Sequence, residues 1–165
     1  MVKPKVFITR RWPKEAEERL KKIFDVTLNQ DDKVLSNNEI AEGFYNHDAL
    51  ACTVSDTIDE NIIKSGKTGK GKIIANFGVG FNHIDLNACK KYKIVVTNTP
   101  DILTDATADL TILLMLMVSR RSKEGEYEIE NNKWAGWRPT HLLGSELSHK
   151  TLGIIGLGRI GQAVA

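Results

Sequence analysis

The chain has 165 residues, of which 41% are hydrophobic and 27% are charged, as in soluble globular proteins. Its net charge of +2 is too small to indicate a nucleic acid or an anionic membrane as a partner. Cys52 and Cys89 form no CxxC pair, so we predict neither a disulfide framework nor a metal site, and expect both to be buried as small hydrophobic residues. The N-terminal MVKPKVFITRR has too short an apolar stretch for a signal peptide, and we expect a cytoplasmic protein.

The first hundred residues alternate between short β-rich runs and amphipathic segments. The runs predict strands at Lys5–Thr9, Val26–Leu28, Ala49–Val54, Lys72–Asn76 and Ile94–Asn98. Helices are expected between them, at Pro13–Phe24, from a capping box formed by Ser36 and Glu39, at Thr57–Ser65 (ended by Gly66) and at Asp85–Tyr92. Because each parallel connection needs a crossover, five strands separated by four helices predict an α/β fold with a doubly wound parallel sheet.

Pro100 marks a boundary between residues 1–99 and residues 100–165. Beyond it we expect a long helix from Thr104 to about Arg121, a charged helix over 123–132 and an irregular arm over 134–147. The first of these helices is apolar nearly all round, yet its apolar run over 110–118 is well short of the ~20 residues that span a bilayer. Such a helix must be covered on every face, and we favour a homodimer interface over 104–147 to a purely intrachain core.

The last segment, TLGIIGLGRIGQAVA, predicts the start of a dinucleotide site. Residues 151–156 are expected to form a buried strand, followed by a G-x-G-x-x-G turn that runs into a helix. Gly156 permits the tight turn, Gly158 lets the backbone approach a pyrophosphate, and Gly161 allows close packing of helix and strand. The diphosphate would lie at the helix N-terminus; a glycine-rich turn without a ligand is the alternative. The residue that selects NAD or NADP is expected ~20 positions further on, so the sequence does not reveal this choice.

Two other glycine-rich segments require separate interpretations. Residues 66–73 nearly fit the phosphate-loop pattern, but Ile73 replaces the required hydroxyl and the segment precedes a strand, so we predict a solvated loop. NFGVGFNHID, residues 76–85, follows the fourth strand at the edge where open α/β sheets bind ligands. Its glycines can turn successive amides toward one point, which suits a carboxylate or phosphate. On spacing alone, a structural turn explains the segment equally well.

The histidines do not predict a catalytic group. His83 lies nearest to a plausible site, but the sequence places no carboxylate to orient it, and the other three lie in turns or in the arm. We therefore interpret all four as surface or packing residues. We assign no catalytic residue and no metal ligand.

The segments NFGVGFNHID, TPDILTDATADLTILLMLMVSRR, WAGWRP and TLGIIGLGRIGQAVA together resemble the D-2-hydroxyacid dehydrogenases, most closely the glyoxylate/hydroxypyruvate reductase branch. The resemblance implies a flavodoxin-like substrate domain over 1–99 and the start of a Rossmann cofactor domain over 100–165, truncated after the glycine fingerprint. It implies that the substrate is bound by Val54, Ser55, Val79, Gly80 and Trp137. It implies that NAD or NADP is bound by Thr104, Gly156, Leu157, Gly158, Arg159, Ile160 and Gly161.

The implied activity is NAD(P)-dependent reduction of small 2-keto acids, such as glyoxylate or hydroxypyruvate, to D-2-hydroxy acids. The arginine, glutamate and histidine that carry catalysis in the family match no residue here, so we expect this chain to be a fragment that is inactive alone. Two alternatives stay open: a sister dehydrogenase acting on lactate, glycerate or phosphoglycerate, and a cofactor-sensing dimeric corepressor of the same fold. Trp137 and the turn at Val54 favour the reductase.

Overall fold

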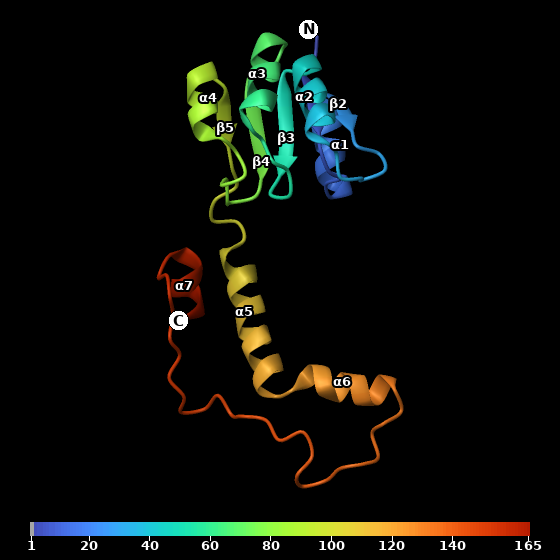
Figure 1. Ribbon diagram of the computed structural model, residues 1–165, viewed down its shortest axis with the longest axis vertical. Helices are drawn as coiled ribbons and strands as arrows, with labels where there is room; N and C mark the ends of the chain where they lie inside the picture. Colours follow the sequence, from blue (N-terminus) through green and yellow to red (C-terminus); the bar gives the residue numbers. More distant parts are fainter. Residues whose placement is uncertain (1) are drawn as a thin grey trace. The chain divides into compact units, whose positions relative to one another are not determined.

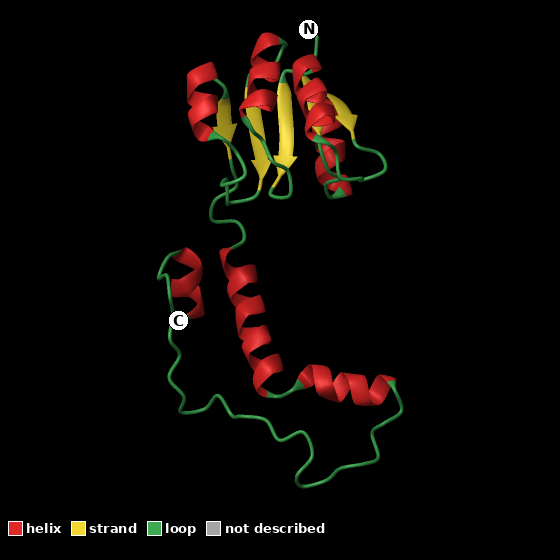
Figure 2. Ribbon diagram, viewed as in Figure 1, coloured by secondary structure: helices red, strands yellow, loops and turns green. Residues whose placement is uncertain are grey.

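The computed structural model describes residues 2–165. These residues form two compact units, which divide between Pro100 and Asp101. The first unit contains all the strands and the second consists of helices joined by extended segments (Figures 1 and 2).

The first unit is a parallel five-stranded sheet with helices on both faces (Figure 1). The strands are β1 (Lys5–Ile8), β2 (Asp25–Leu28), β3 (Ala49–Thr53), β4 (Ile73–Phe77) and β5 (Val95–Thr97). The helices are α1 (Lys14–Ile23), α2 (Asn37–Asn46), α3 (Glu60–Thr68) and α4 (Leu86–Tyr92). The strand order β2-β1-β3-β4-β5 is that of flavodoxin-like folds. The predicted α/β class and all nine elements are confirmed, with end points that differ by a few residues.

Alternating strand side chains build a separate core on each face of the sheet. One core joins Leu50 and Ile74 of the strands to α2, α3 and α4, and the other joins Val6 and Ile8 to α1. Both cysteines lie in the first core, where burial raises the pKa of Cys52 to about 12 and that of Cys89 to about 11. The prediction that they are small buried residues is confirmed.

The predicted end of the third helix at Gly66 is wrong. Helix α3 continues to Thr68, and the Gly69 N–H caps it by donating to the Ser65 carbonyl at 3.0 Å. Gly66 is buried, and a Cβ at this position would overlap the ring of Phe44, which is itself fully buried. Glycine is thus needed here for close packing of α2 against α3. The segment 66–73 forms a helix end, a turn and the first residue of β4, so it lacks the strand-to-helix turn of a phosphate loop.

We expect Gly66→Ala to destabilise the first unit although alanine is the better helix former. The added methyl group must displace the Phe44 ring in a filled core, and such overpacking costs about 1–3 kcal/mol. Urea unfolding followed by circular dichroism measures the change. Lys64→Ala, on the exposed side of the same helix, is the matched control and should leave the midpoint nearly unchanged. An equally stable Gly66→Ala chain would show that the core has room for the methyl group.

The predicted capping box starts α2. The Ser36 hydroxyl accepts from the Glu39 N–H at 3.3 Å, and the Ser36 N–H donates to the Glu39 carboxylate at 2.8 Å. The Lys33 ammonium lies 2.9 Å from the other carboxylate oxygen. The hydrogen bond from Lys33, followed by those from Ser36, lowers the pKa of Glu39 from 4.5 to about 2. The helix start therefore depends on an ionised carboxylate.

Acidification should consequently weaken the first unit. Because the folded-state pKa of Glu39 lies below its usual 4.5, the carboxylate stabilises the fold above this pH and loses that effect as the pH falls toward 2. We expect the thermal midpoint of Glu39→Gln to be lower than that of the parent chain at pH 6 and to converge with it near pH 2. Glu42→Gln, on the exposed face of the same helix, is the control. A constant difference across this range would contradict the assignment.

The second unit contains α5 (Thr104–Ser119), α6 (Ser122–Glu130) and α7 (Arg159–Val164). The two predicted helices before the arm are confirmed, and α7 packs beside α5. The predicted buried strand over 151–156 is wrong: the segment is extended but unpaired, and Ile155 is fully exposed. A strand needs a neighbour to accept its hydrogen bonds, and residues 101–165 form no other strand. None of the helices within residues 2–165 has the length and apolar character needed to cross a membrane.

Candidate functional site

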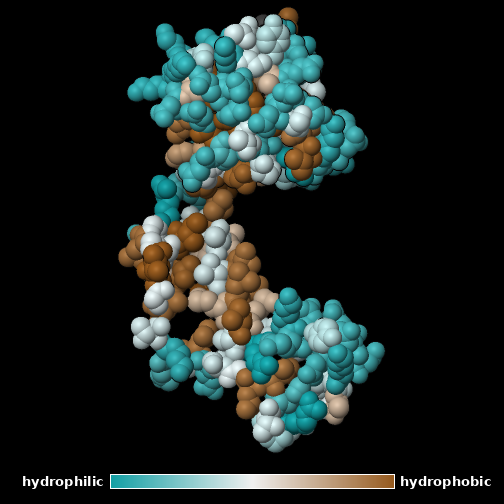
Figure 3. Space-filling model, in the orientation of Figure 1, coloured by the Kyte–Doolittle hydropathy of each residue, from teal (hydrophilic) through white to brown (hydrophobic). Residues whose placement is uncertain are grey.

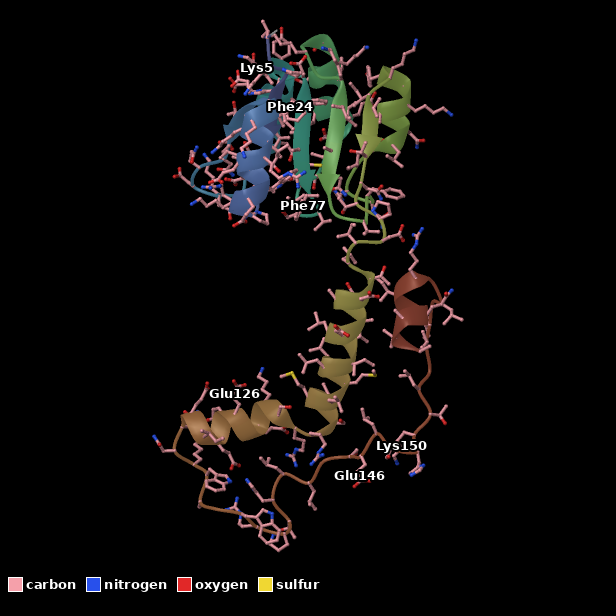
Figure 4. All side chains as sticks on the ribbon, turned by 180° about the vertical axis from the view of Figure 1, so that it is seen from behind. Lys5, Phe24, Phe77, Glu126, Glu146 and Lys150 are labelled. Carbon is pink, nitrogen blue, oxygen red and sulfur yellow. The ribbon has the colours of Figure 1, made fainter. Side chains whose placement is uncertain are left out.

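The loops that follow β3 and β4 leave the sheet side by side. Thr53 at the end of β3 lies opposite Phe77 at the end of β4, which is labelled at this edge in Figure 4. The first loop carries Val54 and Ser55, and the second carries residues 78–80. The two loops are in contact, because a Cβ on Gly78 would lie 2.8 Å from Val54 Cγ1. The structure therefore brings together the four substrate-site residues predicted in this unit.

The carbonyl groups of residues 78–80 are all held by the protein. Asn76 is 2% exposed, and its Nδ2 donates to the carbonyls of Gly78 at 3.1 Å and of Gly80 at 2.8 Å. Asn98, directly after β5, donates to the Val79 carbonyl at 2.9 Å. Within residues 2–165 the N–H groups of Val79 and Gly80 have no acceptor. The loop therefore offers donors without competing acceptors, which suits an anion.

His83 fixes the orientation of the Asn76 side chain. Its Nε2 lies 3.0 Å from Asn76 Oδ1, and since the Asn76 amide group already donates to two carbonyls, Oδ1 can only accept. Nε2 therefore carries the proton and donates. Burial lowers the pKa of His83, while the charge of Asp56 opposes this shift. His83 is thus half-buried and bonded to the side chain that holds the loop.

A buried carboxylate anchors the loop after β3. Asp56 is 7% exposed and accepts from the Thr9 hydroxyl at 2.6 Å and from the Thr53 N–H at 2.8 Å. Thr9 follows β1, so Asp56 joins the ends of two neighbouring strands. The Ser55 hydroxyl lies 2.8 Å from that of Thr53. We did not predict these anchors from the sequence, although polar residues within three positions of the end of a buried strand are the signal that could have identified them.

A second buried carboxylate organises the turn after β1. Glu17, 2% exposed, receives two hydrogen bonds from the Arg11 guanidinium at 2.7 and 2.8 Å and one from the Trp12 N–H at 2.9 Å. The Arg11 hydrogen bond is the main cause of the lowered pKa of Glu17. The turn places the Trp12 ring against Phe77, with ring centroids 5.0 Å apart. The edge of the sheet thus has an aromatic wall beside the polar loops.

The remaining predicted site residues belong to the second unit. Gly156 has a φ of +95°, which favours glycine, and Gly158 caps α7. A Cβ on Gly161 would collide with the Gly156 carbonyl, whereas the space beside Gly158 is open. Gly156 and Gly161 thus meet steric demands of the turn, while the backbone at Gly158 is accessible. Thr104 begins α5, and the Trp137 side chain in the arm is 82% exposed.

The family model of the D-isomer specific 2-hydroxyacid dehydrogenase catalytic domain matches residues 6–159. The chain belongs to this family. It is 42% identical to a glyoxylate reductase of Thermococcus litoralis, with 99% of this chain and 50% of the relative aligned. It is 40% identical both to the human glyoxylate reductase/hydroxypyruvate reductase (98% and 49% aligned) and to the glycerate dehydrogenase of Hyphomicrobium methylovorum (100% and 51% aligned). The chain thus spans about half the length of the curated relatives it matches.

Solved structures show the same relationship. A provisionally named D-isomer specific 2-hydroxyacid dehydrogenase, NAD-binding, from Polaromonas superposes with a TM-score of 0.91 at 37% identity, covering 99% of this chain and 51% of the other. The NADPH-dependent glyoxylate/hydroxypyruvate reductase of Sinorhizobium meliloti, in complex with NADP and malonate, gives a TM-score of 0.78 at 27% identity, covering 98% and 49%. The fold of the chain is therefore that of half a 2-hydroxyacid dehydrogenase.

Proposed function

We propose that the chain forms the substrate-binding part, and the beginning of the cofactor-binding part, of an NAD(P)-dependent reductase of small 2-keto acids such as glyoxylate or hydroxypyruvate. The observation that carries this proposal is that the N–H groups of Val79 and Gly80 have no acceptor within residues 2–165, while the carbonyls of residues 78–80 are all engaged. A substrate carboxylate accepts hydrogen bonds and donates none, so it matches such a loop. Val54 and Ser55 border the loop on the same edge.

The division of labour follows the two units. Residues 1–99 would form the flavodoxin-like substrate domain, and residues 100–165 the start of a Rossmann domain. The open space beside Gly158 fits the approach of a diphosphate, which the backbone of the Gly156–Gly161 turn would hold, with Thr104 near the nicotinamide. The bound nicotinamide would supply a hydride to the keto carbon. The relatives with NAD and with NADP support this cofactor class without selecting between them.

A sister dehydrogenase is the second candidate function. The chain is 40% identical both to a glycerate dehydrogenase and to the human reductase. These identities favour the sister dehydrogenase and the reductase equally. The backbone loop recognises only the carboxylate, which both substrate classes share. Selectivity between them depends on the groups around the rest of the substrate, among which we place Trp137.

Titration with oxalate, a stable dicarboxylate, tests the carboxylate loop. We expect the amide signals of Val79 and Gly80 to shift in ¹H–¹⁵N spectra of the chain, because each N–H gains a charged acceptor. Two such hydrogen bonds, each worth about 1.5–3 kcal/mol, correspond to a dissociation constant on the order of millimolar. Uncharged oxamide serves as the control ligand and should leave these signals in place. Shifts confined to other loops would count against this site.

The apolar surface of α5 supports a homodimer through residues 104–147. Brown hydrophobic residues are prominent in the part of the second unit around α5 in Figure 3. The exposed apolar side chains of α5 include Leu110 (53% exposed), Leu113 (50%), Leu114 (51%) and Val118 (79%). An apolar groove of about 730 Å³ lies between α5 and the arm. A continuous surface of this kind is unusual on a monomer and typical of subunit interfaces.

Sedimentation at micromolar concentration should therefore show a dimer or a larger assembly. Replacing Leu113 by Glu would place a charge in the proposed interface, and we expect it to shift the equilibrium toward the monomer. Asp109→Asn replaces one polar side chain of the same helix by another, so this control variant should preserve the assembly. A parent chain that stays monomeric at all concentrations would refute the interface.

A further inference from the structure

Asn76 uses its whole side chain to hold one loop. It lies in β4 on the core face, where its two carbonyl bonds and its bond from His83 satisfy both ends of the carboxamide. Burying an unpaired asparagine is unfavourable, so an apolar residue would suit this position better if the side chain served only to fill the core. We therefore relate the presence of asparagine at this position to its hydrogen bonds with the loop.

The peptide geometry links these bonds to the direction of the free amides. In a trans peptide unit, the C=O of one residue and the N–H of the next point in opposite directions. The Gly78 carbonyl is held inward by Asn76 and by the Thr99 N–H at 3.0 Å, so the Val79 N–H faces the other way. The Val79 carbonyl is held by Asn98, so the same holds for the Gly80 N–H.

We propose that Asn76 and Asn98 are positioning residues, which hold the Val79 and Gly80 amides in the direction that receives the substrate carboxylate. This inference rests on the proposed function for the identity of the ligand. Neither asparagine contacts the carboxylate itself; each acts through the carbonyl that it binds. The two side chains come from the ends of different strands, β4 and β5, so the sheet determines the direction in which the N–H groups of the loop point.

Three variants of the chain test this role. Asn98→Ala removes the bond to Val79 from a half-buried position, and Asn76→Asp keeps the size of the side chain while removing its N–H donors. Cys52→Ala is the control, because Cys52 is fully buried and lies 3.8 Å from Asn76 Oδ1 but bonds no loop carbonyl. The backbone ¹³C and ¹⁵N shifts of residues 78–80 are measured first without ligand, and the affinity for oxalate second.

We expect both asparagine variants to shift the loop signals and to lower the oxalate affinity about tenfold, as the loss of one well-oriented hydrogen bond predicts. Cys52→Ala should lower the unfolding midpoint but keep the loop signals and the affinity. Unchanged loop shifts and affinity in Asn98→Ala would overturn the inference, even if Asn76→Asp fails to fold. If the variants change the free loop but the parent chain binds no oxalate, the orienting role stands and the proposed function fails.

Discussion

The parallel register between β3 and β4 is the constraint on which the candidate site depends. Ala49 lies opposite Ile73 and Thr53 opposite Phe77, so the two strands end at the same level. Because no tight turn can join parallel strands, α3 returns the chain to the start of β4, and both loops emerge at the carboxyl edge. A one-residue slip of β4 would turn Asn76 to the opposite face and leave the glycine loop without its buried donor. The pairing of β3 with β4 therefore also determines how the loops of the candidate site are placed.

Most of the first unit could be predicted from the sequence because its elements are defined locally. The β-branched runs and amphipathic segments are short and alternate, and the Ser36–Glu39 capping box is visible within four residues. One error in this unit and one in the second unit involve distant partners. Glycine stands at position 66 inside α3 because Phe44 occupies the space that a side chain would need, and residues 151–156 form no strand because pairing requires a neighbour. Neither fact is contained in the segment itself.

The candidate site was less accessible from the sequence. A glycine pair after an apolar strand indicated either a turn that directs successive amides toward one point or a purely structural turn, and Val79 and Gly80 were implied only by the resemblance to the family. The sequence did not show what holds that turn, because Asn98 lies 19 residues from Val79 and only the sheet brings them together. Asn76 carried a usable signal, since a polar residue within a buried strand must find partners. The groups to which it donates, however, are backbone carbonyls, and a sequence does not distinguish one carbonyl from another.

The hydrogen bond from His83 Nε2 to Asn76, which holds the loop in place, does not depend on the charge of the imidazole. The neutral ring donates from Nε2 to Asn76, and the doubly protonated ring carries a hydrogen on the same nitrogen. Protonation of the histidine therefore adds a proton at Nδ1 without removing the Nε2 bond from the network. The backbone amides keep their direction in both states. The framework of the loop proposed to bind an anion is thus independent of the protonation state of His83.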